Sequence, residues 1–169
     1  MRGDAAAMSK FVTFCAAVPY ALVALALRFI MARVFFLSGQ TKIEGPRSIP
    51  FRPGIGDLEF SVILPAGIKD ATFQMFEAQY AGLPVAPAVV AYLFTYAEFV
   101  LPICLVLGFG TRLAALALLV MTVLLQVYVM PGMLWSAHVY WAAILLVLMT
   151  VGPGAISVDA MIRGIYRRA

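Results

Sequence analysis

Long apolar runs, separated by short polar interruptions, make up most of the chain. A helix needs about 20 apolar residues to cross the hydrocarbon core of a bilayer. Runs of this length occupy residues 15–38, 86–107, 111–130 and 134–151. Pro and Gly residues between the last two runs are typical of a helix break. The pattern predicts four transmembrane helices, with the last three joined by tight turns.

Only one long interruption separates these runs, over residues 39–85. It is too apolar and too varied in composition to be disordered. Within it, residues 58–64 partly alternate between apolar and polar positions, which indicates a short strand. Residues 70–80 carry aromatic side chains at helical spacing, which favours an amphipathic helix on the membrane or on the bundle. We therefore expect a folded outer loop.

The C-terminal segment differs from the runs before it, because apolar residues alternate there with basic ones. Gly152-Pro153-Gly154 breaks the last apolar run, and residues 155–168 follow. This pattern predicts an interfacial helix on an anionic membrane surface. The predicted fold class is an all-α membrane protein. We expect residues 1–169 to form one domain, a four-transmembrane-helix bundle with an extended first extracytoplasmic loop.

Composition agrees with a membrane protein, since 64% of the 169 residues are hydrophobic, only 12% are charged, and the mean hydropathy is +1.00. A soluble domain of ordinary makeup is excluded, and no nucleic-acid signature appears. Basic residues set the expected orientation. One side carries Arg2, Lys10, Arg112, Arg163, Arg167 and Arg168, against Lys42, Arg47, Arg52 and Lys69 in the long loop. Both termini are therefore expected in the cytoplasm.

Ionisable residues inside the apolar runs are the first candidates for function, because a lipid-facing charge costs at least a few kcal/mol. Counted inward from the outer face, Arg28 and Glu98 lie at similar depths on antiparallel helices. We expect them to form an intramembrane ion pair. The pair either fixes helix registration or handles protons or substrate.

Three further polar residues, Arg33, Gln126 and His138, lie in the outer third of the runs. Beside aromatic residues they supply what a quinone headgroup needs, with Arg33 and His138 as donors to its carbonyl oxygens and Gln126 orienting its ring. The alternative is an aromatic belt with His138 as a polar residue at the water boundary. No catalytic residue is assigned. One histidine without a cysteine motif predicts no metal site, and a Cu(I) site using nearby methionines is the weaker alternative.

Several segments together resemble one family. They are Arg33–Lys42, Phe76–Ala78, Gly82–Pro84, Glu98, Leu107–Arg112, His138 and Gly152–Asp159. In order and spacing they are similar to the DoxX family of small bacterial membrane proteins, over about residues 25–162. The resemblance implies four transmembrane helices in the bacterial inner membrane. Some relatives form the membrane subunit of a thiosulfate:quinone oxidoreductase. Residues 43–68 have no counterpart in the family pattern.

Three functions follow from these observations. The first is an integral membrane subunit of a redox-linked system, which binds a quinone or anchors an oxidoreductase partner; if the chain is enzymatic, it is as a quinone-linked oxidoreductase subunit. The second is a small-solute transporter or channel that uses the Arg28 and Glu98 interior. The third is a pure membrane anchor whose outer loop recruits a partner. In each case the expected partners are the lipid bilayer and a second protein or another copy of the chain.

Overall fold

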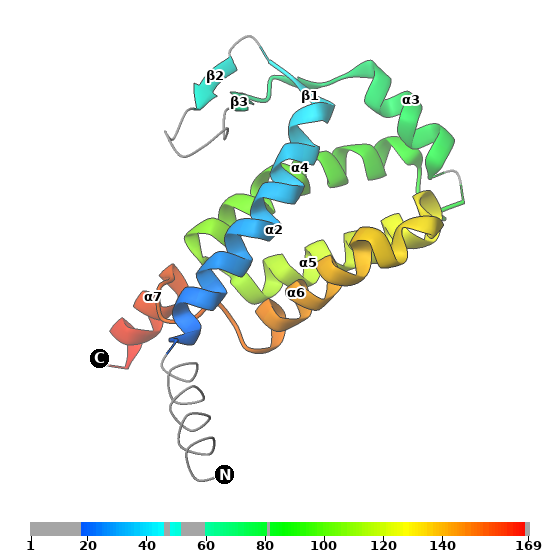
Figure 1. Cartoon of the computed structure of the whole chain (residues 1–169). Helices are drawn as coiled ribbons and strands as arrows, with labels where there is room; N and C mark the ends of the chain where they lie inside the picture. The colour runs from blue at the N-terminus through cyan, green and yellow to red at the C-terminus, as the bar shows by residue number, and fades with distance from the viewer. Residues whose placement is uncertain (1–17, 46–47, 52–59, 81, 168–169) are drawn as a thin grey trace, which may run out of the picture.

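Four long helices dominate the computed structural model, which describes residues 18–45, 48–51, 60–80 and 82–167 (Figure 1). They are α2 (Tyr20–Lys42), α4 (Pro87–Leu107), α5 (Thr111–Leu124) and α6 (Val139–Thr150). A π-helical turn, η1 (Leu125–Val129), extends α5, while η2 (Pro131–Met133) and the π-helical η3 (Leu134–His138) lead into α6. Four spans result that are long and apolar enough to cross a membrane, Tyr20–Lys42, Pro87–Leu107, Thr111–Val129 and Pro131–Thr150. The predicted all-α, four-helix membrane fold is confirmed.

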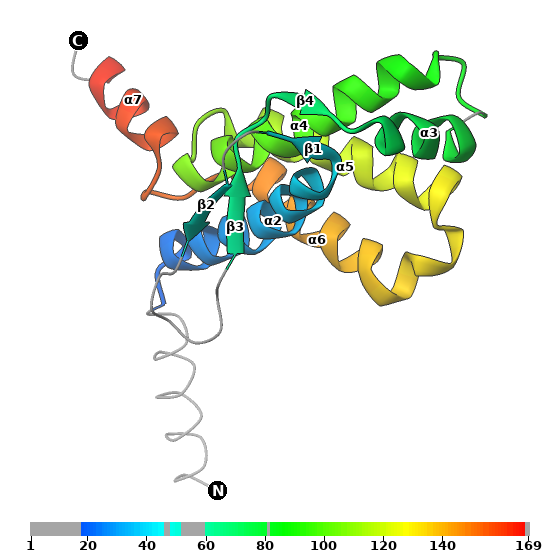
Figure 2. The same ribbon diagram turned by 90° about the horizontal axis from the view of Figure 1, so that it is seen from above.

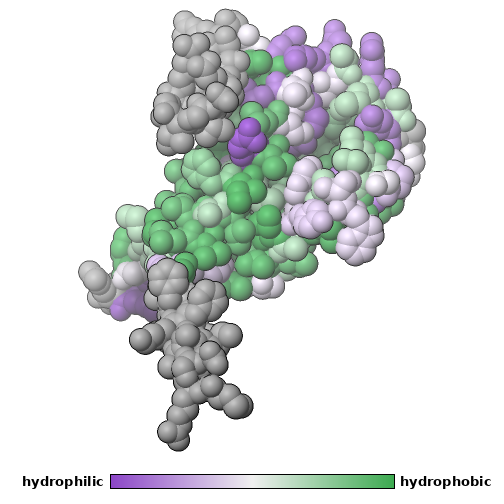
Figure 3. All heavy atoms as spheres, in the orientation of Figure 1, coloured by the Kyte–Doolittle hydropathy of each residue, from purple (hydrophilic) through white to green (hydrophobic). Residues whose placement is uncertain are grey.

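The helical spans keep much of their apolar surface on the outside. Leu93 is 67% exposed, Leu113 74% and Trp135 75%. Figure 3 shows hydrophobic residues covering most of the visible helical surface, with hydrophilic residues gathered at the upper end near α3. Apolar patches of this size on a bundle of spanning length are expected where the solvent is lipid.

Proline and glycine set the ends of the spans. Pro87 begins α4, where its missing N–H costs nothing. Gly108 (φ +71°) and Gly110 (φ +56°) then form a tight turn between α4 and α5 through left-handed conformations that favour glycine. Pro131 ends the run that began at Thr111. The first helix departs from expectation, because it continues to Lys42 instead of ending at residue 38.

The helices pack around a small apolar core. α2 lies on α4, α4 on α5, α5 on α6, and α6 closes onto α2. The crossing of α2 with α4 is close at Gly39, where an added Cβ would lie 3.1 Å from Cβ of Glu98. The fully buried apolar residues include Met31, Leu118 and Leu145. Small residues at a crossing let the two backbones approach in a membrane bundle.

The described parts of the segment between α2 and α4, called the outer segment after its predicted location, fold against one end of the bundle, as Figures 1 and 2 show. Strand β1 (Ile43–Glu44) pairs antiparallel with β4 (Gly67–Ile68), and β2 (Ser48–Phe51) pairs antiparallel with β3 (Phe60–Ile63). Helix α3 (Asp70–Gln79) follows and packs on α4. The expected strand in 58–64 and the expected helix in 70–80 are thus observed, although residues 58–59 lie outside the described part of the chain.

A short helix, α7 (Val158–Tyr166), ends the described chain next to the turn between α4 and α5. Ser157 caps it by accepting a hydrogen bond from Ala160 N at 3.1 Å. Asp159 in turn caps α5, accepting from Gly110 N at 2.8 Å and from Thr111 N at 3.0 Å. Asp159 N also donates to the carbonyl oxygen of Gly108 at 2.9 Å. These contacts of Asp159 fix α7 at the end of the bundle opposite the outer segment.

Candidate functional site

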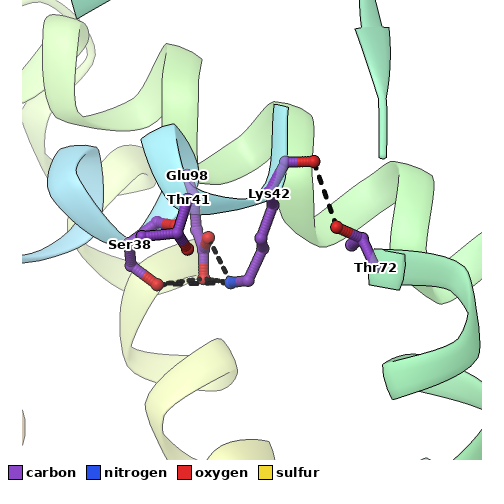
Figure 4. Close-up of polar contacts among 5 residues, drawn as sticks. All are labelled: Ser38, Thr41, Lys42, Thr72 and Glu98. Carbon is purple, nitrogen blue, oxygen red and sulfur yellow. Dashed lines mark hydrogen bonds and ion pairs between the residues drawn. The ribbon is translucent and has the colours of Figure 1, made fainter. Parts of the chain in front are cut away.

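A buried ion pair joins α2 to α4 where the two helices cross. Lys42 Nζ donates to Glu98 Oε1 at 2.6 Å and also contacts Oε2. The Glu98 carboxylate is 1% exposed and the Lys42 side chain 13% exposed. Ser38 Oγ lies 3.3 Å from Glu98 Oε1 and 3.2 Å from Lys42 Nζ (Figure 4). The carboxylate therefore has a charge partner and a hydroxyl donor inside the protein.

The outer segment closes over this ion pair. Thr72 Oγ1, at the start of α3, donates to the carbonyl oxygen of Lys42 at 3.1 Å. Lys42 Nζ lies 6.0 Å from the centre of the Phe76 ring, and Phe76 stacks on Tyr80 with ring centres 4.7 Å apart. Burial raises the pKa of the Tyr80 hydroxyl, and the Glu98 carboxylate adds to the effect. Tyr80 therefore stays neutral beside the pair.

Arg28 does not reach Glu98, so the expected Arg28–Glu98 ion pair is wrong. Arg28 is fully buried in the first half of α2, where its Nη2 donates to the carbonyl oxygen of Ile156 at 2.5 Å. Its Nε and Nη1 meet no hydrogen-bond partner among the described residues. Arg28 precedes Gly39, the residue that faces Glu98, by about 16 Å along the helix axis.

Counting residues inward from the outer face gave the wrong partner, because the count assumes that the start of α4 is level with the end of α2. In the structure Lys42, at the end of α2, pairs with Glu98 about three turns into α4. The first half of α4 is covered instead by α3, through contacts such as Phe76 on Phe94 at 5.9 Å. Lys42 was missed as the partner. The sequence feature that could have identified Lys42 is its spacing from Ser38, which lies one helical turn earlier on the same face of α2.

Two of the three residues expected at the pocket do meet. His138 Nδ1 lies 2.7 Å from Gln126 Oε1, and Gln126 Nε2 donates to the carbonyl oxygen of Pro131 at 2.7 Å. His138 is 3% exposed. Both residues belong to π-helical turns, Gln126 to η1 and His138 to η3. Single π-helical turns inside α-helices are frequent at functional sites.

Aromatic side chains stand beside His138. The Trp141 ring lies 5.2 Å from the imidazole, and Phe35 of α2 packs edge-on against Trp141 at 5.8 Å. This contact brings the first spanning helix to the fourth. The surroundings of the histidine are thus apolar and flat-sided, which suits an aromatic or quinoid ring.

Arg33 does not join this pair. It is exposed, whereas Phe35 is 2% exposed and contacts Trp141. Residues two positions apart on a helix point about 200° apart. Arg33 therefore faces away from the side of α2 that approaches His138. Its long side chain continues the exposed stripe formed by Leu22, Phe29 and Ile30.

Comparison with known proteins gives a family match. Residues 23–131 match the DoxX family. No curated protein and no solved structure matches the chain at a significant level. The matched region contains α2 from residue 23 onward, the outer segment, α4, α5 and η1, and so includes both partners of the ion pair and Gln126.

Proposed function

Because the chain belongs to the DoxX family and is an integral membrane protein, we propose that it is the membrane subunit of a redox-linked system in which His138 exchanges a proton with a quinone-like headgroup. The observation that carries this proposal is the hydrogen bond between His138 Nδ1 and Gln126 Oε1. This bond determines which ring nitrogen is left for a ligand.

The tautomer of His138 follows from the partners of Gln126. A carbonyl oxygen only accepts, so the amide nitrogen of Gln126 must face Pro131 and its amide oxygen must face His138. The imidazole Nδ1 then carries a proton and donates it. In the neutral ring Nε2 is consequently the unprotonated nitrogen, and no hydrogen bond occupies it among the described residues. A ring held in this way can accept a proton at Nε2 and later release it.

The chemistry that suits this nitrogen is proton exchange with a carbonyl or hydroxyl oxygen. When a quinone is reduced, two electrons and two protons convert it to the quinol. The electrons would come from a partner oxidoreductase, one proton from Nε2 of the protonated His138, and the second proton from water. Trp141 and Phe35 supply flat apolar contacts for the ring. His138 thus has the role of a proton donor and acceptor.

Orientation and partners belong to the same proposal. The basic residues of the N-terminal segment, of the first turn of α5 and of the C-terminal segment favour a cytoplasmic location for both termini in a bacterial inner membrane. The outer segment then faces outward and offers a surface for an oxidoreductase partner. The small-solute transporter is the competing function, and the Lys42–Glu98 pair is the polar interior it would use.

Quinone titration tests the proposal. A short-chain ubiquinone analogue titrated into purified protein should bind saturably, and more tightly as the pH falls from 8 to 5, because the protonated imidazole donates from Nε2. His138→Gln should weaken binding roughly tenfold or more and abolish this pH dependence. Ser136→Ala is the matched control, because Ser136 lies two residues before His138 in the same π-helical turn and is exposed. This variant should bind as the wild type does. Unsaturable binding in the wild type, or unchanged binding in His138→Gln, would refute the proposal.

A further inference from the structure

A cavity of about 330 Å³ lies at the α7 end of the bundle, away from His138 and from the Lys42–Glu98 pair. Its walls come from the start of α5, from the turn before α7, and from α7 itself. The residues that line it are Gly110, Arg112, Leu113, Pro153, Asp159, Ile162 and Arg163. Two guanidinium groups and three apolar side chains thus share one opening.

The polar side of the cavity favours an anion. Asp159 is the only acidic residue in the lining, and backbone amides engage both of its carboxylate oxygens. Among the described residues, Arg163 donates only through Nε, to the carbonyl oxygen of Asp159 at 3.1 Å. Arg112 donates only through Nη2, to the carbonyl oxygen of Val151 at 3.3 Å. Each guanidinium therefore keeps further N–H donors. Charged N–H donors of this kind bind phosphate and carboxylate oxygens strongly.

The apolar side of the cavity favours an acyl chain over a free anion. Leu113 is 74% exposed and belongs to the first turn of the third span. Ile162, which is 37% exposed, faces the same cavity from α7. The outer face of α7 continues this surface with Met161, Ile165 and Tyr166, which are 68%, 67% and 79% exposed. A dissolved phosphate would leave these side chains without a partner.

We infer that this cavity binds the headgroup of an anionic phospholipid, with the phosphate on Arg112 and Arg163 and an acyl chain against Leu113 and Ile162. A phosphate diester offers two acceptor oxygens to two guanidinium groups. The lipid bridges α5 and α7, so its binding stabilises the attachment of the C-terminal helix to the bundle. The inference does not depend on the proposed quinone function.

Native mass spectrometry of the delipidated full chain tests this inference, with phosphatidylglycerol and phosphatidylcholine of identical acyl chains as the two probes. We expect one phosphatidylglycerol to bind per chain in preference to phosphatidylcholine. An arginine beside an anionic lipid contributes about 1 kcal/mol, which corresponds to about fivefold in affinity. Arg112→Gln and Arg163→Gln should each weaken binding by about that factor, and the double variant by about 25-fold.

Arg167→Gln is the matched control, because Arg167 is exposed, follows Arg163 by one helical turn, and does not line the cavity. It should retain the wild-type affinity. A second arm measures thermal stability with phosphatidylglycerol or with millimolar inorganic phosphate, and only the lipid should stabilise the wild type. Equal binding of the two lipids, equal stabilisation by free phosphate, or an equal loss in Arg167→Gln would each overturn the inference.

Discussion

Removing Lys42 is the sharpest test of the ion pair at the crossing of α2 and α4. Lys42→Met keeps most of the side-chain volume and deletes the charge that faces Glu98 Oε1 at 2.6 Å. The Glu98 carboxylate is 1% exposed, so the variant leaves a charge buried without its counter-charge. Breaking a buried pair in this way costs about 3–5 kcal/mol.

Protonation limits this cost. An ordinary glutamate has a pKa of about 4.3, so holding Glu98 neutral at pH 7 costs about 3.7 kcal/mol. We therefore expect Lys42→Met to lose about 3–4 kcal/mol of unfolding free energy at pH 7. The loss should shrink by about 1.4 kcal/mol for each pH unit below 7, because the unfolded carboxyl group also approaches its protonated form. At pH 5.5 about 1.6 kcal/mol should remain.

Thermal unfolding in a mild detergent between pH 5.5 and 7.5 measures the effect, which corresponds to roughly 10 °C at pH 7. Lys69→Met is the matched control, because among the described residues the Lys69 ammonium donates only to the carbonyl oxygen of Thr41, through a solvent-exposed hydrogen bond. Its loss should be small and independent of pH. The double variant Lys42→Met/Glu98→Gln should recover part of the stability. A loss in Lys42→Met that does not change with pH, or additive losses in the double variant, would refute the buried-charge argument.

Two further predictions concern the turn at the α7 end and the orientation of the chain. Gly108→Ala should destabilise the protein by more than 2 kcal/mol in thermal unfolding, since its Cβ would lie 2.1 Å from Arg28 Nη1. At Gly110 an added Cβ meets open space, so Gly110→Ala should cost only about 1 kcal/mol, for its left-handed backbone. Equal losses in the two variants would contradict the packing at Gly108. In a cysteine-free background of intact cells, a membrane-impermeant maleimide should label Glu77→Cys, on the exposed face of α3, and spare Arg167→Cys; the reverse pattern would invert the proposed topology.

Sequence patterns alone were sufficient for the elements that depend on local composition. The length of each apolar run set the number of spans, because a bilayer core of fixed thickness requires about 20 residues of helix. Helix α3 could also be predicted, since its aromatic residues recur at helical spacing over 70–80. The sequence could also predict that His138 and Gln126 lie close together. A short hairpin joins the two helices, so facing positions near it must lie close together.

Only the tertiary structure decided which distant polar residues meet. The choice of Lys42 over Arg28 as the partner of Glu98 depends on where α2 crosses α4, and that point is set by the close approach at Gly39 and by α3 covering the first half of α4. Counting residues from a membrane surface assumes parallel axes and level ends, and neither holds here. Arg33 was wrongly predicted to face His138 because the apolar run that contains it is hydrophobic on all sides. Hydropathy therefore does not determine which face of this helix turns toward the bundle. Apolar runs fix how many helices span the membrane, whereas side-chain packing between them fixes their rotation and depth.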